Sequence, residues 1–92
     1  MSRPVGVAGL SHLGLVAAAS IAAKGFDVIA FDPDKYLIDG LNRTVLPVVE
    51  PGLSDLVAAN RQQLFFTTDA GQLERCGVVY LARDVPTDNG GV

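Results

Sequence analysis

Two glycines, a serine and a distant aspartate are the residues whose types and spacing point to a ligand. The segment Gly9-Leu10-Ser11-His12-Leu13-Gly14 separates an apolar run from an alanine-rich one, and Asp32 follows Gly14 by 18 positions. A glycine turn between a strand and a helix admits a pyrophosphate, and an acid after the next strand accepts hydrogen bonds from a ribose. The pattern predicts a dinucleotide site, and the charge of Asp32 favours NAD because it repels the 2′-phosphate of NADP.

Ser11 departs from the usual motif, which has a second glycine there to bring the backbone against the pyrophosphate. Its side chain must either point away from the ligand or donate its hydroxyl to a phosphate oxygen. The amides and the dipole at the start of the following helix still favour an anion. Two alternatives stay open: a glycine turn that binds nothing, and Asp32 before Pro33 acting only as a helix N-cap.

The segments around this motif predict alternating strands and helices. Apolar runs indicate strands at 5–8, 26–31, 64–67 and 78–82, and helices are expected at 14–24, from Asp32-Pro33 to about Asn42, from 50–52 to about Asn60, and from Asp69 to about Cys76. This order predicts one α/β domain over 1–92, a Rossmann-like three-layer α/β/α half-fold with parallel strands in the order 3-2-1-4. Parallel strands are usually covered on both faces, so Tyr80 is expected in the core. Residues 44–49 and 86–92 are predicted to be loop or tail.

Composition argues against several classes of protein. With 10 acidic and 7 basic residues, the net charge is −3 and offers no basic stripe for nucleic acid. Cys76 is the one cysteine, so neither a disulfide nor a metal site is expected, and the default location is a reducing cytoplasm. The uncharged stretch from Val5 to Ala23 is long enough for a signal peptide or a membrane span, but its glycines favour a strand, a turn and a helix.

Four segments match, in order and spacing, the motifs of one enzyme family. Residues 7–16 are similar to V-x-G-L-G-Y-V-G-L-V, 47–53 to P-I-Y-E-P-G-L, 64–69 to L-x-F-T-T-D, and 86–88 to P-T-D. On these motifs the chain resembles the N-terminal domain of the UDP-glucose/GDP-mannose dehydrogenases, which are nucleotide-sugar 6-dehydrogenases. The agreement in spacing extends along essentially all of the sequence.

The resemblance implies an NAD-dependent enzyme of polysaccharide precursor synthesis. Such enzymes oxidise the C6 hydroxyl of a sugar to a carboxylate in two hydride transfers, through a thioester on a cysteine of a later domain. Cys76 does not match that cysteine, so we expect no catalytic residue within 1–92 and no activity from this part alone. The cofactor-binding residues that the resemblance implies are Gly9, Ser11, His12, Leu13 and Gly14 at the pyrophosphate, Asp32 at the ribose, and Lys35, Pro86 and Thr87.

Several positions depart from the family motifs. His12 replaces a Tyr, and a surface turn position suits it better than catalysis because no local carboxylate would orient it. Leu37 stands where the family usually has a Lys or Arg that reaches toward the ribose. Lys35 could take that role, or it could be only a solvated lysine. Asp84 would place a negative charge beside the pyrophosphate, which Arg83 could offset.

These departures keep a second function open, a degenerate relative that retains the fold as a binding or assembly module. The expected partners are NAD and, in a longer enzyme, a nucleotide sugar, with neither nucleic acid nor a membrane. The edge of a small sheet also makes a homodimer an option. Glu50, before Pro51-Gly52, is interpreted as part of a turn and helix start rather than as a catalyst.

Overall fold

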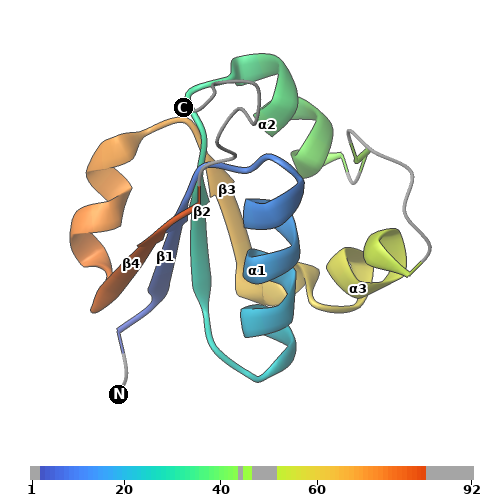
Figure 1. Cartoon of the computed structure of the whole chain (residues 1–92), viewed down its shortest axis with the longest axis horizontal. Helices are drawn as coiled ribbons and strands as arrows, with labels where there is room; N and C mark the ends of the chain where they lie inside the picture. The colour runs from blue at the N-terminus through green and yellow to red at the C-terminus, as the bar shows by residue number, and fades with distance from the viewer. Residues whose placement is uncertain (1–2, 44, 47–51, 83–92) are drawn as a thin grey trace, which may run out of the picture.

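The computed structural model describes residues 3–43, 45–46 and 52–82. Four parallel strands form the sheet of this described part: β1 (Val5–Ala8), β2 (Val28–Phe31), β3 (Leu64–Thr67) and β4 (Val78–Leu81). Their order is β3-β2-β1-β4 (Figure 1), and the register places Val7 beside Ala30 on one side and Tyr80 on the other. The predicted parallel order 3-2-1-4 is confirmed, although β2 begins two residues later than expected.

Helices cover the two faces of this sheet unequally. The described helices are α1 (His12–Ala23), α2 (Lys35–Asn42), α3 (Leu53–Ala59), and the 3-10 turns η1 (Arg61–Gln63) and η2 (Ala70–Arg75). Figure 1 shows α1 and α3 together on one side of the sheet and η2 on the other. The three-layer arrangement is therefore confirmed. Within the described residues, the layer opposite α1 and α3 consists of the single 3-10 segment η2.

Helix α1 starts earlier than the sequence predicted and ends where it predicted. Ser11 has extended backbone angles (φ −69°, ψ −173°) and forms the N-cap, so the helix begins at His12 rather than Gly14. At the other end, Gly25 has a φ of +99°, which stops the helix. Three buried alanines of α1, Ala18, Ala19 and Ala22, allow the helix to lie close against the sheet.

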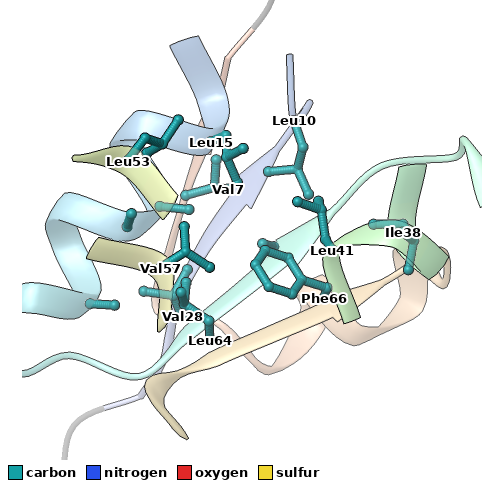
Figure 2. Close-up of a cluster of buried hydrophobic side chains, with 14 residues drawn as sticks. Val7, Leu10, Leu15, Val28, Ile38, Leu41, Leu53, Val57, Leu64 and Phe66 are labelled. Carbon is teal, nitrogen blue, oxygen red and sulfur yellow. The ribbon is translucent and has the colours of Figure 1, made fainter. Parts of the chain in front are cut away.

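The buried core lies between the sheet and the α1 side (Figure 2). Strand residues alternate in direction, and those that point to this side join residues of α1, α2 and α3 in one cluster. Its labelled members are Val7, Leu10, Leu15, Val28, Ile38, Leu41, Leu53, Val57, Leu64 and Phe66. Leu37 packs against this cluster from α2, which places its side chain with the core.

The exposure of strand β4 differs from what the sequence predicted. Tyr80 was expected in the core, yet it is 53% exposed and Leu81 is 76% exposed. The physical reason is position: β4 pairs with β1 at one edge of the sheet, and the main contacts of α1 are with β1, β2, β3 and α3. An apolar run alone therefore predicted a strand correctly and its burial incorrectly.

The segment after β3 is a 3-10 turn with half of the expected capping box. Asp69 accepts a hydrogen bond from the Gly71 amide at 2.9 Å, as a capping residue should. The amide of Asp69 donates to the hydroxyl of Thr67 at 3.0 Å and not to the side chain of Gln72. The second hydrogen bond of the predicted capping box is therefore not formed. Of the predicted loop at 44–49, only 45–46 are described, without regular structure, and Glu50, Pro51 and the tail lie outside the described residues.

The uncharged stretch from Val5 to Ala23 is divided by the turn into β1 and α1. Among the helices of the described residues, none has the length and apolar character needed to cross a membrane. The single-span interpretation of this stretch is thus not supported by its structure.

Candidate functional site

The predicted site lies at the carboxyl edge of the sheet, where β1 turns into α1. From β1 the chain continues to β2 and β3 on one side of the sheet, whereas β4 pairs with β1 on the other side. The order of the strands therefore changes direction at β1. In open α/β sheets, ligands bind at such a switch point, outside the carboxyl ends of the strands. The turn is anchored to both neighbours, since Gly9 donates to the Phe31 carbonyl at 2.9 Å and Ala82 donates to the Ala8 carbonyl at 2.8 Å.

The first and third motif glycines are required by packing. Gly9 has a φ of +99°, and a Cβ atom at this position would overlap the carbonyl oxygen of Ala82. A Cβ atom at Gly14 would overlap the carbonyl oxygen of Gly9. Strand β1, helix α1 and the end of β4 therefore approach one another as closely as the dinucleotide motif requires.

Ser11 presents a buried hydroxyl at the place of the second glycine. Its Oγ atom is buried, makes no capping bond to α1, and has no hydrogen-bond partner among the described residues. A buried hydroxyl without a partner is costly, and a phosphate oxygen is an acceptor that would satisfy it. No acidic residue lies in the first turn of α1, so the positive end of the helix dipole is not neutralised there.

Asp32 lies at the end of β2 with both carboxylate oxygens engaged. Oδ2 accepts from the Leu10 amide at 2.9 Å, and Oδ1 accepts from the Asp34 amide at 2.9 Å. The N-cap of α2 is Asp34, which accepts from the amides of Tyr36 and Leu37. The alternative that Asp32 caps the helix is therefore wrong, and its carboxylate belongs to the glycine turn.

The other residues that the sequence analysis considered differ in where they lie. His12, Leu13 and Lys35 are exposed at the starts of α1 and α2. Leu37 packs on the core, so it does not reach toward a ribose. Pro86 and Thr87, with Arg83 and Asp84, lie outside the described residues.

Together, these features fit NAD. The glycine pair provides a close backbone approach, the buried Ser11 hydroxyl has no acceptor within the described part of the chain, and Asp32 provides acceptors next to the turn. No group of three or more His, Cys, Asp and Glu side chains in the described part of the chain could hold a metal ion.

The raised pKa of the Cys76 thiol argues against a role as a nucleophile. Burial raises the pKa of the Cys76 thiol, and the positive charges of Arg75 and Arg3 only partly oppose this effect. The thiol therefore stays protonated at neutral pH, whereas a nucleophilic cysteine needs a lowered pKa. Cys76 is half-buried beside Gly6, consistent with packing between η2 and β1.

Two surface hollows lie at the opposite end of the sheet. One is lined by the ends of α1 and α3, including Ala22 and Asn60, and the other by residues at the starts of the strands, including Pro4 and Asp27. Neither includes the glycine turn or Asp32.

The contact between Asp32 and the Leu10 amide is the feature that sequence analysis missed. The two residues are 22 positions apart, so no local pattern signals their hydrogen bond. The one available signal was topological, because the carboxyl ends of neighbouring parallel strands meet at the same edge.

Residues 3–91 match the sequence profile described as the UDP-glucose/GDP-mannose dehydrogenase family, NAD binding domain. The chain belongs to this family. UDP-glucose 6-dehydrogenase of Bacillus subtilis (strain 168) is 35% identical over 97% of this chain, which spans 20% of that protein. The chain spans 10–20% of the lengths of the first curated relatives that it matches.

Solved structures of the family have the same fold. The GDP-mannose dehydrogenase of Pseudomonas aeruginosa, solved as a ternary complex, superposes with a TM-score of 0.86 and is 32% identical, covering 96% of this chain and 21% of that one. The UDP-D-ManNAc dehydrogenase of Pyrococcus horikoshii gives 0.85 at 25% identity, covering 90% of this chain and 20% of that one. The chain is therefore a Rossmann-like NAD-binding domain of nucleotide-sugar dehydrogenases, as its motifs predicted.

Proposed function

We propose that the turn Gly9–Gly14 and Asp32 bind NAD in this chain. The pyrophosphate lies against Gly9, Ser11, His12, Leu13 and Gly14, where the Ser11 hydroxyl donates to a phosphate oxygen. The adenosine ribose lies at Asp32, with Lys35 beside it. The observation that carries this proposal is the carboxylate of Asp32 bound to the Leu10 amide, because it puts the ribose acceptor next to the phosphate-binding turn.

Pro86 and Thr87 complete the proposed NAD site. They rest on the resemblance of their motif to the P-T-D of the family, which follows the fourth strand. Strand β4 pairs in parallel with β1, so the carboxyl end of β4 lies at the same edge of the sheet as the glycine turn.

In the whole enzyme, we propose that this domain serves a nucleotide-sugar 6-dehydrogenase. NAD, when bound, supplies the hydride acceptor for oxidation of the C6 hydroxyl to a carboxylate. This chain's own residues bind and orient the cofactor, while the catalytic cysteine that the resemblance implies belongs to a later domain of such an enzyme. Relatives named as UDP-glucose and GDP-mannose 6-dehydrogenases support this activity. A cytoplasmic role in polysaccharide precursor synthesis is part of the same proposal.

A homodimer through the edge of β4 is a further part of the proposal. The strand Val78–Leu81 carries no charged side chain, its four residues are exposed, and in the described sheet it pairs only with β1. Uncharged edge strands pair readily with other strands. Sedimentation of the 92-residue chain is expected to show a dimer that Val79→Lys abolishes; a monomer at all concentrations contradicts the proposal.

Calorimetry with NADH and NADPH tests cofactor binding. NADH is expected to bind with millimolar or tighter affinity, and NADPH at least about tenfold more weakly, because its 2′-phosphate meets the carboxylate of Asp32. Asp39→Asn, an exposed position on α2, is the control and should leave binding unchanged. Equal affinity for both cofactors, or no binding of either, would contradict the proposed site in this chain and favour the binding or assembly module.

A further inference from the structure

We infer that Asp32 also positions the phosphate-binding turn, which its carboxylate holds in shape before the cofactor arrives. This inference rests on the proposed NAD site and gives Asp32 a second task beside accepting the ribose hydroxyls. The same carboxylate thereby couples the two halves of the site, the turn for the pyrophosphate and the acceptor for the ribose.

Hydrogen bonds hold both the backbone amide and the carboxylate of Asp32. Its amide donates to the Thr67 carbonyl at 3.1 Å, which holds the backbone against β3. Its two oxygens then accept from Leu10 in the turn and Asp34 before α2, each at 2.9 Å. A carboxylate held from both sides cannot swing away from the turn without losing one of these bonds.

The Leu10 amide depends on this carboxylate. Leu10 is completely buried and lies between β1 and α1, outside the hydrogen-bond ladder of the sheet and outside the helix. A buried amide that loses its acceptor is strongly unfavourable, and bonds to an ionised acceptor are the stronger kind. Removing the Asp32 carboxylate would thus release the turn directly after Gly9.

The carboxylate still has room for the ribose. An ionised carboxyl group offers about four lone-pair sites, and two of them are used by the amides of Leu10 and Asp34. Two sites remain for the two hydroxyls of a ribose. The two amides bind different oxygens of Asp32, and Asp32→Asn replaces one of these oxygens with an NH2 group that can only donate, so in this geometry the variant cannot satisfy both amides.

Amide hydrogen exchange of the ligand-free chain, followed by NMR, tests this inference without any cofactor. In Asp32→Asn, exchange at Leu10 is expected to accelerate at least about tenfold relative to Gly9, whose amide keeps its bond to Phe31. Asp34→Asn is the matched control, because its side chain binds the start of α2 and not the turn, and Leu10 exchange should be unchanged. Equal acceleration at Gly9 and Leu10, or none at Leu10, would overturn the inference.

A measurement on the unsubstituted chain covers the case in which Asp32→Asn does not fold. A scalar coupling through the hydrogen bond, between the Leu10 amide nitrogen and the Asp32 carboxyl carbon, is expected. A well-resolved spectrum without this coupling would contradict the inference.

A ligand without ribose hydroxyls separates the two tasks of Asp32. The probe is 2′,3′-dideoxyadenosine 5′-diphosphate, which keeps the pyrophosphate group but cannot use the ribose acceptors. If Asp32 positions the turn, Asp32→Asn weakens binding of this probe at least about threefold; unchanged or tighter binding means that Asp32 only binds ribose. Failure of the unsubstituted chain to bind NADH would instead contradict the proposed NAD site, and the exchange measurement would still decide the role of Asp32 in the turn.

Discussion

Gly9→Ala is expected to lower the free energy of unfolding by about 2–5 kcal/mol, a large part of the stability of a domain of this size. Two costs add. A residue with a side chain pays about 1–2 kcal/mol for a left-handed backbone, and Gly9 has a φ of +99°. The new Cβ atom also overlaps the carbonyl oxygen of Ala82, and forcing extra volume into packed structure costs about 1–3 kcal/mol.

Gly25→Ala is the matched control for this prediction. Gly25 has the same φ of +99°, but nothing lies within 4 Å of the added Cβ atom. Its substitution is therefore expected to cost only the backbone part, about 1–2 kcal/mol. Urea unfolding followed by circular dichroism measures both; equal losses in the two variants would show that the turn does not approach β4 as closely as described.

Leu10→Ala is expected to destabilise the chain by about 2–5 kcal/mol, the usual range for a buried leucine. Leu10 is 0% exposed, and Figure 2 shows its side chain directed toward Leu41 in the core. The amide of the same residue donates a hydrogen bond to Asp32. The side chain of Leu10 therefore holds the turn against the core, and its backbone holds the turn against Asp32. Weaker NADH binding is expected along with the lost stability.

Leu13→Ala is the comparison for Leu10, because it removes the same atoms from the same motif. Leu13 is 56% exposed, and surface substitutions of this kind usually change stability by less than about 0.5 kcal/mol. Thermal unfolding of the two variants measures the difference. A loss at Leu13 as large as that at Leu10 would mean that the core does not extend under the turn as described.

Much of the fold could be predicted from local sequence. Short apolar runs predicted the bounds of β1 and β3 correctly and those of β2 and β4 to within two residues, and Lys24-Gly25 predicted the end of α1. The parallel order followed because helices alternate with strands and crossovers are right-handed. These features depend on neighbouring residues or on general rules of chain connection, which a sequence displays directly.

The features that could not be predicted depend on contacts between distant residues. Asp32 was the N-cap that the sequence suggested, but Asp34 caps α2, and the carboxylate of Asp32 instead accepts from the Leu10 amide, 22 positions away. Tyr80 was expected in the core because parallel strands are usually covered on both faces, yet it is 53% exposed; the predicted order placed β4 at an edge but did not reveal how little of this strand the helices cover. Leu37 likewise turned out to face the core rather than the site.

The candidate site shows the same division. Gly9, Gly14 and Asp32 were singled out by spacing, and the structure brings the first two into contact and the third to the turn between them. Whether Ser11 could replace a glycine was undecided in sequence. The structure gives its hydroxyl a buried position with no partner in the described residues, which is compatible with a phosphate ligand.

An NMR titration of the ¹⁵N-labelled chain with NADH tests the central claim most directly, because it locates the ligand residue by residue. The account predicts that the largest shifts fall on amides of 9–15 in the turn and first helical turn and on those of Asp32 and 34–36, while those lining the hollows at the opposite edge, such as Asp27 and Gln63, stay in place. Shifts centred on that opposite edge, or none at the turn at millimolar NADH, would contradict an NAD site built on Gly9–Gly14 and Asp32.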